Sequence, residues 1–356
     1  MTLLRPPSAE AQLAFLSKLQ RLFAEGDFTA TYKFALLVSL ADLAVELGAD
    51  DGASVLLSVR QIAERFVYLY WNHTSPYKPP HAGAGASVLS QNIGSQAAVL
   101  TSIAQFRAST GAATVLQAKR EPEYASLITR VAATVSAQPL NYLQNFGGAS
   151  DPFLYERAER GSVRLHPGIS YCLRRFYPLV QQLSRSHWAT HIKLNRRNHG
   201  IFGDARDLED FLFSTSRQSL ALIGQGLRKL DNNRCFYCGD SVTEMDVDHF
   251  IPFSLYPRDL AHNFVLAHPS CNRSKSDSLA AHSHLERWLE RVVKYGDDLL
   301  GIGAEAGIVG DLATVGRVAT WGYANACAAG GHAWLSPAKY EPVSAHYLDL
   351  LNMISA

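Results

Sequence analysis

Two pairs of metal-binding residue types, separated by about thirty positions, constrain this chain more than any other feature. Cys235 and Cys238 form a Cys-x-x-Cys knuckle, and His268 and Cys271 form a His-x-x-Cys pair. Cysteine sulfur and histidine nitrogen are the ligands of structural zinc sites, and four of them complete a tetrahedral shell. We therefore predict a structural Zn²⁺ site that leaves no ligand position open for water.

Two strands and a helix are predicted within and just after this clamp. Residues 245–251 alternate apolar and acidic side chains, a pattern typical of a strand, and residues 263–267 form a second, apolar strand. After Pro269 no helix-breaking residue occurs until well past Ala280, so we expect one helix there. Strand, loop, strand and helix, tied together by zinc, would bring residues distant in sequence into one site.

Three polar side chains on these elements suit metal-assisted hydrolysis. Asp248 and Asn272 offer hard oxygen donors, which fit one Mg²⁺ or Mn²⁺ ion that also binds phosphate oxygens. A neutral His249 can accept the proton of an attacking water at physiological pH. Arg273 and Lys275 are expected where a nucleic-acid backbone would pass.

This arrangement resembles the HNH, or ββα-metal, endonucleases over roughly residues 232–295. The similarity extends to the HNH domain of RNA-guided CRISPR effector nucleases. The resemblance implies that Asp248 and Asn272 are metal ligands, His249 is the general base and Asn263 organises the loop. The chain departs from the family pattern at one zinc ligand, because His268 stands where zinc-bearing members usually have a cysteine.

Other interpretations of these residues are simpler. A Cys-x-x-Cys with a His-x-x-Cys, taken alone, is more often a structural zinc ribbon, but the Asp-His pair and both asparagines at family spacing favour a nuclease. Asp246 lies on the same side of the strand as Asp248 and would either support the metal or serve a structural role. Asp259 and His262 are expected to be solvated loop residues.

The chain length and composition predict a mainly α-helical protein with more than one domain. With 356 residues and 47% hydrophobic content, the chain can bury a large core. We predict a helical targeting or binding domain in residues 1–229, with a subdivision near 150. A small zinc-stabilised ββα-metal nuclease domain follows in residues 230–300, and a helical extension in residues 301–356.

Apolar periodicity predicts helices along most of the chain. The expected helices cover residues 11–22, 32–47, 59–71, 88–106, 123–135, 169–192, 208–230, 284–295, 313–329 and 346–353. The helix over 32–47 has almost no polar face, which is typical of a buried helix. Residues 153–157 and 162–165 predict a hairpin, and Pro178 predicts a bend in its helix.

Charge is distributed unevenly although the net charge is only +1. Residues 152–229 contain 13 Lys and Arg against 6 Asp and Glu, a net +7, whereas residues 230–356 are acidic with a net −6. The densest basic part carries Lys193, Arg196 and Arg197. We predict a surface that follows nucleic-acid phosphates, and a solvated helix end is an equally weighted alternative.

These features favour a cytoplasmic DNA endonuclease with a restriction or antiphage-defence role. The first residues lack a signal-peptide pattern, and the most apolar run, 34–45, is interrupted by Asp42 and too short to span a bilayer. Double-stranded DNA is the expected partner, together with a protein partner or a homo-oligomer formed through the helical N-terminal domain. Two alternatives stay open: an RNA-directed nuclease, and a zinc-stabilised binding module without catalysis.

Overall fold

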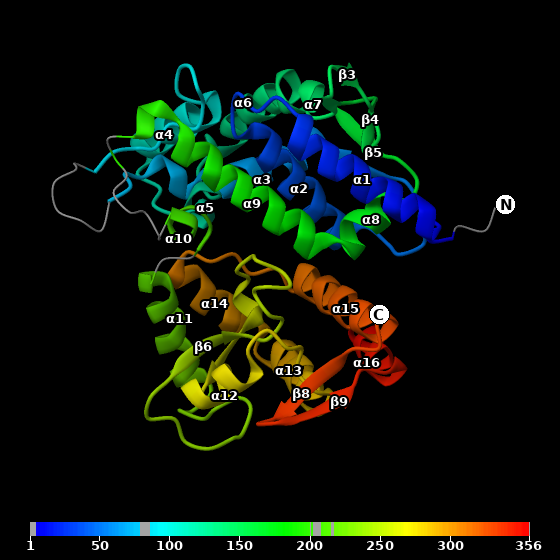
Figure 1. Ribbon diagram of the computed structural model, residues 1–356. Coiled ribbons are helices and arrows are strands. Elements are labelled where there is room, and N and C mark those ends of the chain that lie inside the picture. Colours follow the sequence, from blue (N-terminus) through cyan, green and yellow to red (C-terminus); the bar gives the residue numbers. More distant parts are fainter. Residues whose placement is uncertain (1–4, 79–85, 200, 202–207, 215–216, 356) are drawn as a thin grey trace. The chain divides into compact units, whose positions relative to one another are not determined.

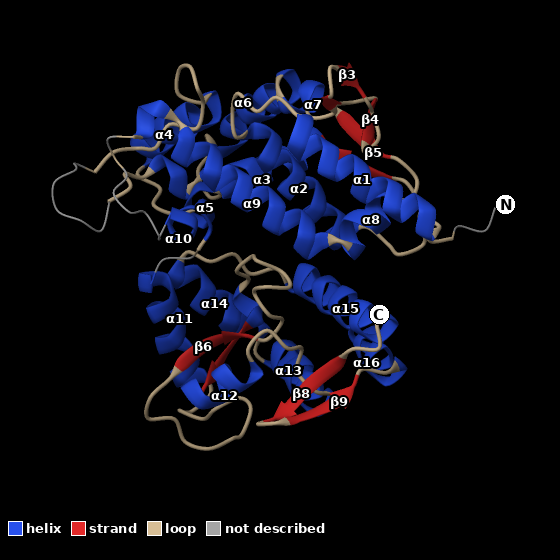
Figure 2. Ribbon diagram, viewed as in Figure 1, coloured by secondary structure: helices blue, strands red, loops and turns tan. Residues whose placement is uncertain are grey.

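The computed structural model describes residues 5–78, 86–199, 201, 208–214 and 217–355. The chain divides into two compact units, Met1–Ser214 and Thr215–Ala356, and each is described by itself. Helices make up most of both units, and the strands are short (Figure 1, Figure 2). This architecture confirms the prediction of a mainly α-helical chain.

The first unit is built from helices with one small sheet and one short hairpin. Its helices are α1 (Ala9–Glu25), α2 (Tyr32–Leu47), α3 (Val59–Tyr70), η1 (Asn72–Thr74, 3₁₀), α4 (Ala98–Thr110), α5 (Val115–Ala118), α6 (Tyr124–Ala137), α7 (Pro139–Tyr142), α8 (Ile169–Arg175), α9 (Tyr177–Leu194), η2 (Arg196–Asn198, 3₁₀) and α10 (Leu208–Phe213). Its strands are β1 (Val55–Ser58), β2 (Asn145–Phe146), β3 (Ala149–Ser150), β4 (Tyr155–Ala158) and β5 (Ser162–Leu165).

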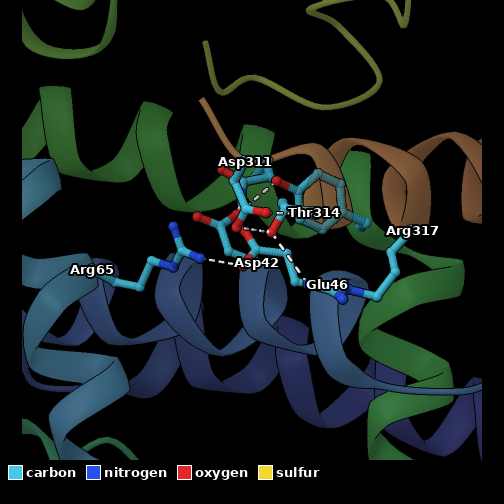
Figure 3. Close-up of polar contacts among 8 residues, drawn as sticks. Asp42, Glu46, Arg65, Asp311, Thr314 and Arg317 are labelled. Atoms are coloured by element: carbon cyan, nitrogen blue, oxygen red, sulfur yellow. Dashed lines mark hydrogen bonds and ion pairs between the residues drawn. The ribbon is translucent and has the colours of Figure 1, made fainter. Parts of the chain in front are cut away.

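Helix α2 is the centre of the first unit. All but the last of its residues are buried, as its nearly continuous apolar surface predicts. Its two acidic side chains have polar partners. Asp42 accepts hydrogen bonds from Tyr177 Oη at 2.7 Å and Gln181 Nε2 at 2.8 Å, and Glu46 forms an ion pair with Arg65 of α3 (Figure 3). These partners offset the cost of burying two carboxylates.

The predicted hairpin is present as β4 and β5, which pair antiparallel with Ala158 opposite Ser162. Gly161 has a φ of 68° in the connecting turn, a left-handed conformation that glycine adopts without steric cost. The structure adds a third strand, since β1 pairs antiparallel with the free edge of β5. The sequence interpretation did not include this strand.

Three expected helices have different bounds in the structure. Residues 88–97 are not helical, because the backbone around Gln91 bonds to residues near Thr31 instead, with Thr31 N donating to Gln91 O at 3.1 Å. The helix expected over 169–192 is divided at Phe176, and Pro178 lies in the first turn of α9, where its missing N–H is harmless. The helix expected over 208–230 is also two helices, α10 and α11, and residues 215–216 lie outside the described residues.

The second unit contains two hairpins surrounded by helices. Its helices are α11 (Arg217–Leu230), η3 (Ala261–Asn263, 3₁₀), α12 (Pro269–Lys275), α13 (His282–Lys294), α14 (Gly296–Ala306), α15 (Leu312–Ala328) and α16 (Ala345–Ser355). Its strands are β6 (Asp246–His249), β7 (Phe264–Ala267), β8 (His332–Ser336) and β9 (Lys339–Pro342). Asp311 caps α15 by accepting the backbone N–H of Thr314 at 3.0 Å (Figure 3).

Strands β6 and β7 form the centre of the second unit. They pair antiparallel with Asp248 opposite Val265 and His249 opposite Phe264. Helix α13 covers this hairpin, and Trp288 stacks on Phe250 with ring centroids 4.6 Å apart. Helix α11 packs against both strands and α14, so the unit begins near residue 215. The domain boundary expected at residue 229 instead falls at the C-terminal end of α11.

Two further differences concern the residues after β7. Helix α12 ends at Lys275, earlier than expected, because Ser276 adopts a φ of 48°, which cannot continue a right-handed helix. The stretch between the helices expected over residues 313–329 and 346–353 contains the β8–β9 hairpin. Its Trp334 exchanges backbone hydrogen bonds with residues 279 and 281 at 2.7 and 2.8 Å.

Among the described helices, none combines the length and apolar character that a bilayer crossing requires.

Candidate nuclease and zinc site

The four predicted zinc ligands converge in the structure. One ligand atom each from Cys235, Cys238, His268 and Cys271 lies within 4.8 Å of the others. The knuckle precedes β6, while His268 is the N-cap residue of α12 and Cys271 lies in its first turn. Three sulfur donors and one nitrogen donor at this spacing match a tetrahedral structural zinc site. The cluster could therefore bind Zn²⁺.

The histidine in this cluster is oriented as a ligand. His268 Nδ1 lies 3.3 Å from the Cys238 sulfur, and Nε2 lies 3.1 Å from the backbone oxygen of Ser241. A carbonyl oxygen can only accept, so Nε2 carries the proton and Nδ1 presents its lone pair to the cluster. Such a hydrogen bond on the far nitrogen is the usual support of a metal-binding histidine. It supports His268 in the place of the usual cysteine.

Asp248 on β6 is buried and held by two donors. Tyr237 Oη donates to Asp248 Oδ2 at 2.5 Å, and Lys275 Nζ lies 3.1 Å from the same oxygen. Burial, followed by the Asp248 charge, holds the pKa of Tyr237 well above its usual value, so the hydroxyl keeps its proton and donates. Oxygen Oδ1 of Asp248 has no hydrogen bond within the described part of the chain.

Lys275 corrects one expectation from the sequence. Its side chain is 0% exposed, and its ammonium also donates to the backbone oxygen of His249 at 2.9 Å. Burial lowers the pKa of Lys275, and the Asp248 charge opposes that shift. The ammonium already has two partners inside the fold, so Lys275 is not a surface contact for nucleic acid. It belongs to the polar core around Asp248.

Asn272 on α12 reaches β6 through Asp246. Its Nδ2 donates to Asp246 Oδ2 at 3.1 Å, which leaves the amide oxygen of Asn272 for another partner. The sequence left the role of Asp246 open between metal support and a structural part. In the structure the Asp246 carboxylate contacts Asn272, and Asp246 shares its strand face with Asp248.

His249 contacts an aspartate that the sequence interpretation assigned to solvent. Its Nε2 lies 2.5 Å from Oδ1 of Asp259, which is only 6% exposed. The imidazole also packs against Phe264 and Phe253, with ring centroids 4.7 and 5.2 Å away. His262 is 1% exposed. The expectation that Asp259 and His262 are solvated is therefore wrong, because the loop folds back onto the hairpin.

Asn263 holds that loop in place. Its side-chain oxygen accepts the backbone N–H of Ile251 at 2.8 Å, and its side-chain nitrogen donates to the backbone oxygen of Ile251 at 2.9 Å. One amide thus fixes both backbone polar groups of the residue two positions after His249. This places Asn263 where the resemblance put a loop-organising asparagine.

The other predicted nucleic-acid contacts are on the surface. Arg273 of α12 is exposed, and so are Lys193, Arg196 and Arg197 at the end of α9 and in η2. Arg273 belongs to the second unit and the other three to the first. All four guanidinium or ammonium groups are accessible, which a phosphate-binding role requires.

Two side chains around the site were not found from the sequence. Tyr237 lies between the two knuckle cysteines, and the sequence pattern there indicates zinc ligands but no role for the tyrosine. Its contact with Asp248 forms only in the folded hairpin. Asp259 lies in an irregular loop ten residues after His249 and follows no periodic pattern. Only the closure of that loop reveals its contact.

The comparisons with known proteins match two parts of this chain. Residues 12–209 match a family described as a domain of unknown function (DUF8808). Residues 235–278 match HNH endonuclease, which points to a nuclease and implies nucleic-acid binding; the narrower similarity to RNA-guided effectors stays a prediction. A search of curated proteins finds no match. The chain thus belongs to the family described as a domain of unknown function (DUF8808), and its residues 235–278 form an HNH endonuclease domain.

Proposed function

We propose that this chain is a metal-dependent endonuclease that hydrolyses phosphodiester bonds in double-stranded DNA. The observation that carries the proposal is the pair His249 and Asp248 on β6, with His249 Nε2 held 2.5 Å from Asp259 inside the HNH match. A partly exposed imidazole beside a buried carboxylate is suited to proton transfer next to a bound cation.

Asp248 and Asn272 are the residues that would hold the catalytic Mg²⁺ or Mn²⁺. Both offer hard oxygen donors, and each keeps one oxygen outside the hydrogen bonds that hold its side chain. When bound, the cation would stabilise the negative charge that develops on the phosphate and the leaving oxygen. The soft sulfur ligands of the knuckle cluster suit Zn²⁺ instead, so the two sites select different metals.

The chain's own residues supply the remaining steps of the proposed reaction. His249 accepts a proton from the attacking water, because a neutral imidazole acts as a base near physiological pH. Tyr237 and Lys275 hold Asp248 in one position through contacts to the same carboxylate oxygen. Exposed Arg273, one residue after Asn272, contacts the phosphate backbone and keeps the scissile bond near β6.

The first unit is proposed to choose where the nuclease acts. An HNH domain contacts mainly the backbone, and phosphate contacts position a protein without specifying a sequence. Residues 230–356 carry a net −6, whereas residues 152–229 carry a net +7, and all but the last fifteen of these belong to the first unit. This basic stretch exposes Lys193, Arg196 and Arg197. This arrangement supports DNA binding by the first unit, directly or through a protein partner or second copy.

A restriction or antiphage-defence role in the cytoplasm completes the proposal. The pairing of an HNH domain with a large helical unit supports the role. Three of the five cysteines lie in the zinc cluster, and the other two, Cys172 and Cys327, have no spacing typical of a disulfide framework, which fits a reducing compartment.

The substrate class is tested by incubating the purified chain with supercoiled plasmid, single-stranded DNA and RNA, each with Mg²⁺ and with EDTA. We expect the plasmid to be cut only with Mg²⁺. Cleavage of RNA alone would reassign the substrate, and no cleavage of any substrate by a zinc-loaded chain would favour a binding module without catalysis.

A further inference from the structure

His249 forms a hydrogen bond through its Nε2 nitrogen. The Nε2 atom lies 2.5 Å from Oδ1 of Asp259. The ring is confined by Phe253 and Phe264, and the side chain is 19% exposed. No hydrogen bond joins Nδ1 to any residue that the structure describes. The two ring nitrogens therefore have different environments.

The contact with Asp259 determines which nitrogen carries the proton. An ionised carboxylate can only accept a hydrogen bond, so Nε2 must donate to it, and in a neutral imidazole the other nitrogen is then the acceptor. In this tautomer the lone pair of Nδ1 faces away from Asp259. A hydrogen bond of this kind is a general way to set both the tautomer and the orientation of a histidine.

Asp259 is itself fixed by the fold. The loop that carries it follows β6, and Asn263 holds Ile251 near the start of this loop with two hydrogen bonds of 2.8 and 2.9 Å. Farther along, Arg258 N donates to Tyr256 O at 2.8 Å, and Asn263 N donates to Leu260 O at 2.9 Å. A carboxylate on an anchored loop can hold an imidazole at low entropic cost, because little of its motion remains to be lost.

We propose that Asp259 is a positioning residue that fixes His249 as the Nε2–H tautomer, so that Nδ1 is the atom that removes the proton from the attacking water. The proton of the water passes to Nδ1 and the electron pair of the water oxygen forms a bond to phosphorus. The bond from phosphorus to the leaving oxygen breaks, and that oxygen keeps the electron pair and takes a proton from solvent. The other ring proton stays on Nε2, hydrogen-bonded to Asp259, throughout. The catalytic consequence rests on the proposed nuclease function. The tautomer itself does not, because it exists without substrate.

The test is nuclear magnetic resonance of the full chain labelled with ¹⁵N in its histidine rings, recorded without substrate. The signals of His249 are assigned by their loss in His249→Gln. We expect the coupling pattern of an Nε2–H tautomer in the wild type. Asp259→Asn keeps the size of the side chain but offers both a donor and an acceptor, so the Nδ1–H tautomer should become populated. Asp298→Asn, a matched change of an exposed aspartate on α14, should leave the signals unchanged.

The steady-state kinetics of cleavage provide a second measurement. Asp259→Asn should lower kcat about 10- to 100-fold with little change in KM, the usual range for the loss of a supporting partner. A predominantly Nδ1–H tautomer in the wild type would overturn the proposal, as would a folded, zinc-loaded Asp259→Asn chain with an unchanged tautomer. If the wild type shows the Nε2–H tautomer but cuts no nucleic acid, the positioning contact stands and only the proposed function fails.

Discussion

The hydroxyl of Tyr237 lies 2.5 Å from a carboxylate oxygen of Asp248. Tyr237 stands between the two knuckle cysteines, and Asp248 is the β6 residue that precedes His249. One hydrogen bond therefore joins the candidate zinc site to the proposed catalytic strand. Any disturbance of the knuckle is expected to reach the position of Asp248.

Removal of this hydroxyl should weaken the site without removing zinc. In Tyr237→Phe the ring still fills its buried position, but Asp248 loses one of its two donors. A hydrogen bond to a charged group contributes about 1.5–3 kcal/mol, so we expect a lower free energy of unfolding and a higher Mg²⁺ requirement for cleavage. Denaturant unfolding and Mg²⁺ titration measure these effects. Tyr340→Phe, at an exposed position of β9, is the control. An unchanged Mg²⁺ requirement in Tyr237→Phe would show that the contact between Tyr237 and Asp248 has no role in the site.

One Zn²⁺ per chain should accompany the purified protein. Cys235→Ser and His268→Ala each remove one ligand, so we expect reduced zinc content and reduced stability, because metal binding contributes directly to folding of a small unit. Elemental analysis with thermal unfolding measures both. Cys327→Ser changes a cysteine outside the cluster and should keep its zinc. Full zinc occupancy in His268→Ala would show that a different group provides the fourth ligand.

The basic surface of the first unit should determine how DNA affinity depends on salt. Replacement of Lys193, Arg196 and Arg197 by alanine should weaken binding and reduce the slope of log affinity against log salt. Each lost phosphate contact on duplex DNA removes about 0.9 from that slope. Fluorescence anisotropy at several salt concentrations measures it, with alanine at exposed Arg120 and Arg130 as the comparison. An unchanged slope in the triple variant would mean that these three residues form a solvated helix end.

The free energy of unfolding of the first unit should decrease as pH falls, because of His73. The side chain is fully buried, Nε2 lies 2.9 Å from Leu212 O, and burial lowers its pKa to about 4. Below its ordinary pKa of about 6.5, His73 binds a proton in the unfolded state but stays neutral in the folded state. The free energy of unfolding therefore decreases as pH falls from about 6.5 to 4. That shift corresponds to about 3 kcal/mol. Unfolding of the wild type and of His73→Gln should converge at low pH; a parallel pH dependence would exclude this origin.

Local patterns in the sequence predicted much of the site. The ligand spacing identified the zinc cluster because each pair of ligands is local: Cys235 and Cys238 share one turn before β6, and His268 and Cys271 share the start of α12. The apolar run at residues 32–47 predicted α2, because a helix with almost no polar face is typical of a buried position. The apolar strand predicted over residues 263–267 is present as β7, Phe264–Ala267, and all four of its residues are buried.

The remaining features depend on contacts between distant residues. The charge of Lys275 suggested a surface position, but the folded hairpin places it beside Asp248, where a buried carboxylate needs a cation. The end of α12 was missed because serine is not a residue type that signals the positive φ that Ser276 adopts. The contact between His249 and Asp259 required the course of an irregular loop.

The role of His249 as general base is tested by the rate of plasmid cleavage by His249→Ala, measured beside the wild type in Mg²⁺. We expect this variant to fold, keep its zinc and bind DNA, while its cleavage rate falls by about 10²–10⁴ because the general base is gone. His346→Ala, at an exposed histidine of α16, should cut at the wild-type rate. Undiminished cleavage by a folded His249→Ala chain would show that His249 is not the general base.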